Sequence, residues 1–207
     1  MKLQIAFDLL DLERCLSIAE QVEPYADRFE IGAPLLYAYG IEAVKSFKKK
    51  FPHKEFIAET QIVDRGKDIT ALYSNGGADW VTVMAEANKH VIHSVCSTAE
   101  QYKKYVMLDL LNTDHIAQSA MDAQTLGVDA LLFHISHEKN RSILEFDAWE
   151  MVRGNSKLPI YIASEINRSN IDQVLALKPN GIIIGKAIVS SENPREEAAF
   201  FHNLCKL

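Results

Sequence analysis

The sequence has few cysteines and no long apolar run. Cys15, Cys96 and Cys205 are odd in number and widely spaced, which excludes a disulfide scaffold and a metal knuckle, so we expect idle thiols in a reducing cytoplasm. No segment approaches the roughly 18 apolar residues that a membrane helix needs. The chain enters a strand-like run directly after Met1, without an export signal. We therefore expect a cytoplasmic protein that does not contact membranes.

An excess of basic residues is also missing. The chain has 22 Lys and Arg against 28 Asp and Glu, a net charge of -6, which disfavours a large binding surface for nucleic acid. Neither a G-x-G-x-x-G loop nor a G-x-x-x-x-G-K-[ST] loop appears, so dinucleotide and P-loop sites lack their motifs. With no linker and 48% hydrophobic residues, residues 1–207 are expected to form a single domain.

A repeat of about 50 residues runs through the chain. Four polar anchors, Asp27, Asp79, Asp129 and Asn180, each follow a residue of modest size and precede an apolar run, and they lie 52, 50 and 51 residues apart. Another strand candidate precedes each anchor. The eight predicted strands are Leu3 to Phe7, Phe29 to Ile31, Glu55 to Ala58, Trp80 to Val83, Tyr105 to Leu110, Ala130 to Phe133, Pro159 to Ala163 and Ile182 to Ile184.

The segments between the strands have apolar residues at helical spacing. The predicted helices are Leu12 to Gln21, Gly40 to Lys50, Ile69 to Asn75, Thr98 to Lys104, Ile116 to Leu126, Phe146 to Val152, Asn170 to Leu177 and Pro194 to Leu204. Strict alternation of strands and helices predicts a parallel sheet, and eight units in 207 residues fit a compact (β/α)8 TIM barrel. An open, doubly wound sheet is the alternative.

Polar side chains gather where the predicted strands end, which in a barrel is the face that carries the active site. They are Asp8, Glu30, Glu59, Gln61, Asp64, Asp109, His134, Ser164, Glu165, Gly185 and Lys186. Several acids on one face favour a functional site. Some residues also have plainer explanations: Asp109 as a turn cap, His134 as a structural histidine, His90 and His93 as surface groups, and Trp80 and Trp149 as core.

Several motifs resemble the orotidine 5'-monophosphate decarboxylase superfamily, in the branch of 3-hexulose-6-phosphate synthase and 3-keto-L-gulonate-6-phosphate decarboxylase. The first predicted strand ends in A-x-D at Asp8, residues 30–34 read E-I-G-A-P, and residues 59–64 resemble the D-x-K-x-x-D signature. Residues 81–83 and 185–188 also fall in register. The resemblance covers the whole chain and implies the same barrel.

The resemblance further implies a carbon-carbon lyase that acts on a phosphorylated keto sugar through an enediolate. It places Mg2+ near Glu30 and Glu59 and phosphate at the seventh and eighth strand-end loops. It also implies a homodimer in which Asp64 reaches the partner's active site. The residues so implicated are Asp8, Gln61, Asp64 and His134 for catalysis and Ser164, Glu165, Arg168, Gly185 and Lys186 for substrate binding.

The chain departs from the family pattern at functional positions. Gln61 replaces the motif lysine and can neither carry a positive charge nor give up a proton near neutral pH. Glu59 replaces an aspartate, the Ser164-Glu165 pair replaces two glycines, and the residue two places after His134 is no longer glycine. Two alternatives therefore stay open: a barrel that binds a ligand or regulates a partner without catalysis, and a lyase with a changed, non-phosphorylated substrate.

Overall fold

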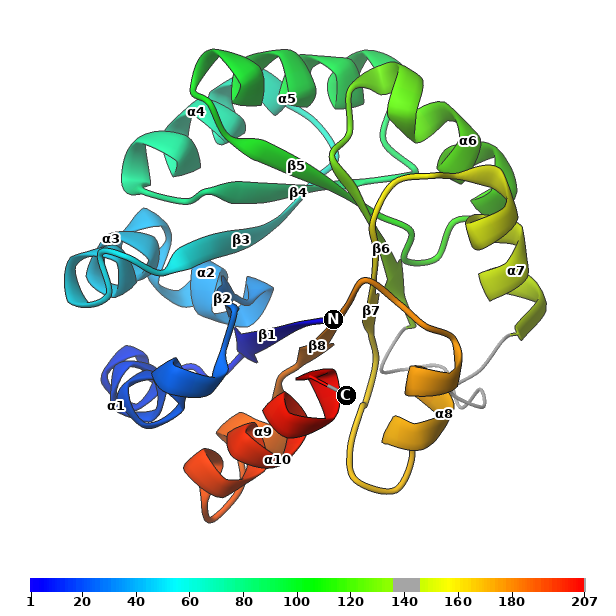
Figure 1. Ribbon diagram of the computed structural model, residues 1–207. Coiled ribbons are helices and arrows are strands. Elements are labelled where there is room, and N and C mark those ends of the chain that lie inside the picture. Colours follow the sequence, from blue (N-terminus) through cyan, green and yellow to red (C-terminus); the bar gives the residue numbers. More distant parts are fainter. Residues whose placement is uncertain (136–145, 207) are drawn as a thin grey trace.

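In the computed structural model, which describes residues 1–135 and 146–206, the chain forms a closed barrel of eight parallel strands in sequence order (Figure 1). Helices surround the barrel on its outside. The predicted TIM barrel is therefore confirmed, and the open sheet is wrong. The strands are β1 (Lys2–Phe7), β2 (Arg28–Ile31), β3 (Glu55–Ile62), β4 (Trp80–Met84), β5 (Tyr105–Asp109), β6 (Ala130–His134), β7 (Ile160–Ala163) and β8 (Gly181–Ile184).

Most of the predicted helices are present within a few residues of their expected bounds. The helices are α1 (Leu12–Val22), α2 (Ala33–Tyr39), α3 (Ile41–Lys50), α4 (Gly66–Gly76), α5 (Lys89–Gln101), α6 (Ile116–Leu126), α7 (Phe146–Asn155), α8 (Ile171–Ala176), α9 (Lys186–Val189) and α10 (Pro194–Lys206), with a 3-10 turn at Glu23–Tyr25. The short helices α2 and α9 were not predicted, and α5 begins nine residues before its expected start. No helix in the described part of the chain is long and apolar enough to cross a membrane.

The 50-residue repeat has a direct structural cause. Each anchor side chain accepts a hydrogen bond from the backbone at the start of the preceding strand. The bonds are Leu3 N to Asp27 (2.8 Å), Phe56 N to Asp79 (3.1 Å), Val106 N to Asp129 (2.8 Å) and Ile160 N to Asn180 (2.9 Å). A short polar residue is thus needed once in every two strands, because it satisfies a donor at the amino-terminal rim of the barrel.

Side chains alternate between the barrel interior and the helical layer, as the pleat of a strand requires. In β1, Leu3, Ile5 and Phe7 belong to the large apolar cluster shared with the helices, whereas Ala6 belongs to a smaller interior cluster. The other members of the interior cluster are Ile57, Trp80, Met107, Ala130, Leu132, Tyr161 and Ile183. These side chains fill the barrel interior, so no ligand would fit among them.

A buried ion pair closes the amino-terminal end of the interior. The Arg28 guanidinium donates to the Glu55 carboxylate and to the Tyr161 hydroxyl (3.0 Å), and it lies over the Trp80 ring, 4.4 Å from the centroid. Trp80 Nε1 donates to Glu55 at 2.7 Å. Gly181 leaves space for the Tyr161 ring, since a Cβ there would lie 2.4 Å from a ring carbon. The interior is therefore sealed at this end.

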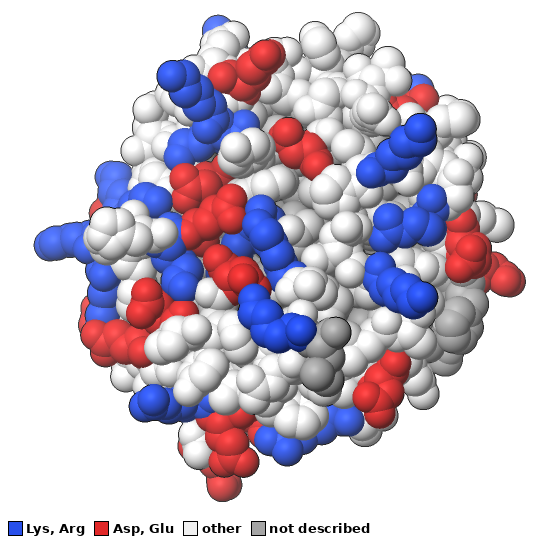
Figure 2. Space-filling view, viewed as in Figure 1, with Lys and Arg blue, Asp and Glu red and all other residues white. Residues whose placement is uncertain are grey.

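Figure 2 shows one face of the molecule, on which acidic and basic side chains are interspersed. Among the described residues of this face, neither positive nor negative charge dominates a broad area. The Lys48-Lys49-Lys50 run forms the last turn of α3, where Lys48 pairs with Asp79 and Lys50 with Glu20.

Candidate active site

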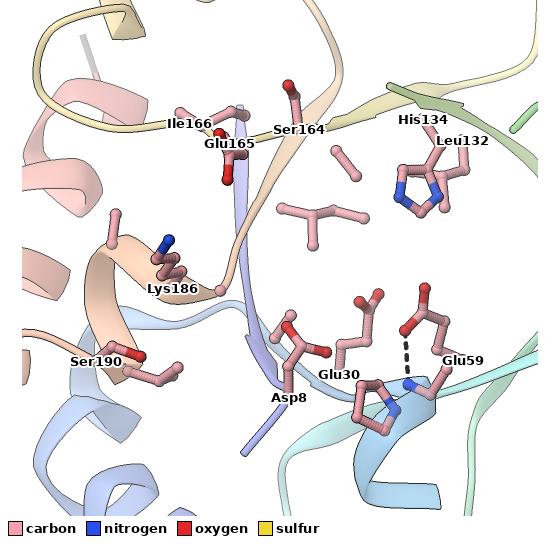
Figure 3. A pocket seen from close by; sticks show the side chains of 18 of the residues that line it. Asp8, Glu30, Glu59, Leu132, His134, Ser164, Glu165, Ile166, Lys186 and Ser190 are labelled. Carbon is pink, nitrogen blue, oxygen red and sulfur yellow. Dashed lines mark hydrogen bonds between the residues drawn. The ribbon is translucent and has the colours of Figure 1, made fainter. Parts of the chain in front are cut away.

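A cavity of about 1010 Å³ opens at the carboxyl ends of the strands. Nine of the eleven residues proposed for the site from the sequence line it: Asp8, Glu30, Glu59, Gln61, His134, Ser164, Glu165, Gly185 and Lys186. Figure 3 shows Asp8, Glu30 and Glu59 side by side, with His134 beyond them and Lys186 on the opposite side. The structure thus brings together residues from six of the eight strand ends, those of β1, β2, β3, β6, β7 and β8.

Glu59 and Gln61 belong to β3 itself, which continues four residues beyond its predicted end. The register against β4 shifts between Ala58 and Ile62, and Gln61 has a positive φ of 44°. The Thr82 hydroxyl accepts from Gln61 N at 2.8 Å, and Thr60 Oγ1 donates to Thr82 O at 2.8 Å. These bonds hold an unfavourable backbone conformation, which is a common feature of functional sites.

The Glu59 carboxylate is fixed on both sides. Its Oε2 accepts a hydrogen bond from Ala33 N at 2.7 Å, shown dashed in Figure 3, and Gln61 Nε2 donates to its Oε1 at 3.4 Å. Burial raises the pKa of Glu59 to about 7, and the Asp8 charge adds to this, whereas the Ala33 hydrogen bond and His134 oppose it. Glu59 therefore changes its charge near neutral pH.

Glu30 lies deeper and is almost fully buried. Gln4 Nε2 donates a short hydrogen bond to Glu30 Oε2 from within the barrel. Burial raises the pKa of Glu30 well above its ordinary value, and the charges of Glu59 and Asp8 raise it further. The groups around the barrel mouth therefore do not fully stabilise the negative charges of Glu30 and Glu59.

His134 and Asp109 form a hydrogen-bonded pair, with His134 Nδ1 3.0 Å from Asp109 Oδ2. The other oxygen of Asp109 accepts from Leu111 N at 2.9 Å, so Asp109 also caps the following turn. Burial alone would lower the pKa of His134, but the hydrogen bond and charge of Asp109, with Glu59 and Asp8, raise it. Asp109 therefore caps a turn, as the plainer explanation expects, and also binds His134, whose ring lines the cavity.

Asp8 sits between two glycines. A Cβ at Gly32 would lie 1.8 Å from Asp8 Oδ1, and a Cβ at Gly185 would lie 2.7 Å from Asp8 Oδ2. Any side chain at Gly32 would displace the carboxylate, since 1.8 Å is far inside van der Waals contact. The glycine of the E-I-G motif therefore allows the close approach of β1 and β2 at the mouth.

Three side chains of the described residues meet as a possible cation site: Glu59, Asp109 and His134, whose ligand atoms lie within 4.8 Å of one another. Carboxylate oxygens and an imidazole nitrogen are ordinary ligands of divalent cations. A cation would offset the surplus negative charge that raises the pKa values of Glu30 and Glu59. The residues present therefore fit a divalent cation.

The other side of the cavity is less acidic. Lys186 begins α9, with Gly185 before it, and Ser164, Ser190 and Glu165 line the same region. Figure 3 shows Glu165 and Lys186 on facing segments at this side. The combination of an ammonium group, hydroxyls and a carboxylate would bind a polar substrate end, although Glu165 would oppose a phosphate dianion.

Two predicted residues lie outside this cavity. Asp64 is solvent-exposed and does not line the pocket of its own chain. Arg168 was expected to supply positive charge to the substrate, but its guanidinium pairs with Glu197 at 2.9 Å and lies over the Phe200 ring. Arg168 does not line the cavity, because residues of α10, distant in the sequence, supply its partners. Ser136, the residue two places after His134 that replaces a family glycine, lies outside the described residues.

Sequence reasoning gave Asp109 too little weight and did not find Gln4. Asp109 ends an apolar run and is followed by a turn, a pattern that is typical of a turn cap. Only the fold shows that Asp109 also contacts His134. Gln4 lies inside a strand, where a polar residue on the interior-facing side was the available signal. The plainer explanations were right elsewhere: Trp80 and Trp149 are core, and the three cysteines are buried and free.

Comparison with known proteins agrees with this geometry. The sequence model of the Orotidine 5'-phosphate decarboxylase / HUMPS family matches residues 1–201. The 3-hexulose-6-phosphate synthase of Bacillus subtilis is 30% identical over 203 residues, which cover 96% of each chain. The structure of 3-hexulose-6-phosphate synthase from Salmonella typhimurium is 29% identical, with a TM-score of 0.93 over 99% of this chain and 98% of that one.

A more distant structure shares the fold. KGPDC from Streptococcus mutans is 21% identical, with a TM-score of 0.87 over 99% of this chain and 97% of that chain. Full-length coverage means that the barrel needs no large insertion or deletion to match. On the family match and the 30% identity, the chain belongs to the Orotidine 5'-phosphate decarboxylase / HUMPS family.

Proposed function

We propose that this protein is a cytoplasmic carbon-carbon lyase, an aldolase or decarboxylase, that acts on a phosphorylated keto sugar through an enediolate. The observation that carries the proposal is the convergence of Glu30, Glu59, Asp109 and His134 at the barrel mouth. The similarity to 3-hexulose-6-phosphate synthases supports the reaction class.

A divalent cation, Mg2+ in the simplest case, would be held near Glu30 and Glu59, and when bound it would stabilise negative charge on the substrate oxygens. The chain's own residues supply the rest. Asp109 holds the ring of His134 by its hydrogen bond, and His134 holds or transfers a proton at a ring nitrogen. Gln61 cannot transfer a proton, so its amide orients Glu59 or a substrate oxygen.

The substrate's phosphate would lie at the opposite side of the cavity. The Lys186 ammonium group, the Gly185 backbone and the Ser164 hydroxyl are the groups that favour an anion there. A keto sugar would then extend from Lys186 towards Glu59 and His134, with Asp8 positioned to accept hydrogen bonds from its hydroxyls.

We also propose a homodimer. Large apolar side chains are exposed around one side of the mouth: Leu10 is 67% exposed, Tyr37 81% and Val63 62%. Asp64 follows Val63 directly, so a partner that covers Val63 would bring Asp64 close to the partner's cavity. Analytical ultracentrifugation of the wild type and of Tyr37→Asp tests this, and a monomeric wild type would contradict it.

The test of the reaction is direct. The pure protein is incubated with 3-keto-L-gulonate 6-phosphate, or with ribulose 5-phosphate and formaldehyde, with and without Mg2+. We expect cation-dependent turnover that is abolished in Glu59→Gln. Absence of turnover both with 3-keto-L-gulonate 6-phosphate and with ribulose 5-phosphate plus formaldehyde would refute this version of the proposal.

One observation favours a second candidate, a barrel that binds a ligand without the ancestral reaction. Gln61 and Glu165 both line the cavity, so positive charge is missing at one end and negative charge is added at the other. The triple variant Gln61→Lys, Ser164→Gly, Glu165→Gly distinguishes the two. Lyase activity that appears only in the triple variant would support loss of function, and wild-type activity would refute it.

A third candidate, a lyase with an unphosphorylated substrate, predicts a different pattern. Glu165 would then accept hydrogen bonds from a hydroxylated or cationic group. Thermal-shift screening of unphosphorylated keto acids and sugars, with and without Mg2+, would show stabilisation that is lost in Glu165→Gln but kept in the matched exposed variant Glu100→Gln.

A further inference from the structure

The strand β3 bulges against β4 beside the candidate active site. The register between the two strands shifts within residues 58–62, so that residues 59–61 lie opposite Thr82 alone. A bulge of this kind interrupts the ladder of backbone hydrogen bonds and changes the direction of the side chains that it carries. This bulge carries Glu59 and Gln61, which both line the cavity. The groups that hold the bulge therefore decide where these two side chains lie.

Thr82 holds the bulge by side-chain hydrogen bonds where the backbone ladder is interrupted. The Thr82 hydroxyl accepts from Gln61 N at 2.8 Å. The Thr60 hydroxyl accepts from Thr82 N at 3.2 Å and donates to Thr82 O at 2.8 Å. The backbone N–H, the carbonyl and the hydroxyl of Thr82 are thus all bonded to the bulge. Because Thr82 is 0% exposed, water cannot take the place of these partners.

The backbone conformation of Gln61 needs such support. Its φ of 44° lies in the left-handed region, which costs free energy in a residue other than glycine. The bond of 3.4 Å from Gln61 Nε2 to Glu59 Oε1 depends on this conformation, because both side chains leave the same bulge. Thr82 itself does not line the cavity. An influence of Thr82 on a ligand in the cavity is therefore indirect and passes through Gln61 and Glu59.

We propose that Thr82 is a positioning residue, which sets the direction of Gln61 and Glu59 towards the substrate from a buried place behind the cavity wall. The proposal rests on the proposed function for the reaction, whereas the hydrogen bond on which it depends is testable without turnover. A displacement of a reacting group by about 1 Å can lower a rate on the order of a hundredfold. Thr82→Val removes the hydroxyl but keeps a β-branched side chain, so it deletes the acceptor of Gln61 N with little change of shape.

The first measurement compares the kinetics of the whole chain with those of three variants, on the substrate that the wild type turns over. In Thr82→Val we expect kcat to fall about tenfold or more and KM to change by less than about threefold, because positioning acts mainly in the transition state. Thr82→Ser, which restores the hydroxyl, should recover most of kcat. Thr70→Val on α4 is the matched control and should keep the wild-type kcat. Thr70 is also 0% exposed, but its hydroxyl has no hydrogen-bond partner in the described part of the chain.

The second measurement is amide hydrogen exchange by nuclear magnetic resonance, which needs no turnover. In Thr82→Val the Gln61 N–H should exchange about tenfold faster or more, because it has lost its acceptor. The Val106 N–H, bonded to Asp129 at the opposite end of the barrel, should exchange at its wild-type rate. An equal acceleration at both amides would show general destabilisation and would overturn the proposal.

The other outcomes also decide it. A Gln61 N–H that is unprotected in the wild type overturns the proposal even if Thr82→Val does not fold. A folded Thr82→Val with wild-type kcat, or with unchanged exchange at Gln61, overturns it as well. The two proposals fail separately. A wild type without turnover refutes the lyase, and exchange at Gln61 then decides the role of Thr82, whereas turnover that Thr82→Val leaves unchanged refutes only the positioning role.

Discussion

Asp79 at the amino-terminal rim and two acids at the carboxyl-terminal mouth lie in opposite electrostatic surroundings. At the amino-terminal rim, Asp79 accepts hydrogen bonds from Phe56 N, Lys48 and Lys104. Burial opposes its charge, but these partners hold the pKa of Asp79 below its ordinary value. At the carboxyl-terminal mouth, burial and neighbouring acids raise the pKa of Glu30 and Glu59. Asp79 stabilises the fold, whereas Glu30 and Glu59 are held in unfavourable surroundings, as expected of a functional site.

Removing the imidazole at the mouth should have the largest effect. If the protein is a lyase, His134→Ala should lower kcat/KM by about 10²- to 10⁴-fold, the usual contribution of a positioned acid or base. Stability at neutral pH should change much less. Steady-state kinetics and urea unfolding of the same preparation check both, and an active His134→Ala would place proton transfer elsewhere.

Neutralising a mouth carboxylate should stabilise the protein at high pH. The pKa of Glu59 rises from an ordinary 4.5 to about 7 in the fold, so the folded state binds the proton more tightly than the unfolded state. The resulting stability is full below pH 4.5 and is lost as the pH rises through 7. At 1.36 kcal/mol per pKa unit, this loss is up to about 3 kcal/mol.

Glu59→Gln should therefore raise the free energy of unfolding at pH 8 and change it little at pH 5. Urea denaturation at the two pH values measures the difference, and Glu100→Gln, an exposed acid on α5, serves as the control. If Glu59→Gln changed the free energy of unfolding equally at both pH values, the inference that the Glu59 carboxylate is destabilised by its surroundings would be contradicted.

Removing an acid at the rim should have the opposite effect. Asp79→Ala should destabilise the fold by about 2 kcal/mol, because the buried Phe56 N–H and two lysines lose their acceptor. Asp79→Asn, which keeps an acceptor for Phe56 N, should lose less. Since the pKa of Asp79 is lowered by folding, its contribution is present at neutral pH and fades as the pH falls below about 4. A loss no larger than in Asp114→Ala, which removes an exposed acid, would contradict the anchor role.

The three cysteines show how far burial, as the main cause, can raise a pKa, for comparison with the clustered acids of the mouth. Burial raises the pKa of Cys15 and Cys205 to about 11 and that of Cys96 to about 12. The native protein should therefore not react with a disulfide reagent at pH 8, and all three thiols should react in denaturant. A fast-reacting thiol in the native state would reveal local opening of the helical layer.

The sequence was sufficient to predict most of the barrel, because the rim anchors recur at a fixed interval and the core alternation follows from the pleat. The start of α5 was missed, although Val91, Ile92, Val95 and Cys96 recur at helical spacing in its first turns and Asn88 caps the helix by accepting from His90 N at 2.9 Å. The helix α2 was missed because it follows Gly32 directly and has no side-chain cap.

The site was predictable to the extent that strand ends define it. Residues that end or directly follow a strand, such as Asp8 and His134, were placed correctly, because the barrel fixes where strands end. Arg168 was misplaced because it lies in a loop and its direction depends on α10. The bond between Asp109 and His134 needs the neighbouring positions of β5 and β6, which residue spacing alone does not give.

The central claim is that the acidic mouth is a metal-dependent lyase centre. The most direct measurement is the initial rate of two reactions: formation of hexulose phosphate from ribulose 5-phosphate and formaldehyde, and decarboxylation of 3-keto-L-gulonate 6-phosphate. Each rate is measured with metal-free protein, before and after addition of Mn2+ or Mg2+. The account predicts turnover with at least one substrate, restored by the cation and absent in Glu59→Gln. No turnover with either substrate and either cation, together with activity in the Gln61→Lys, Ser164→Gly, Glu165→Gly variant, would contradict it.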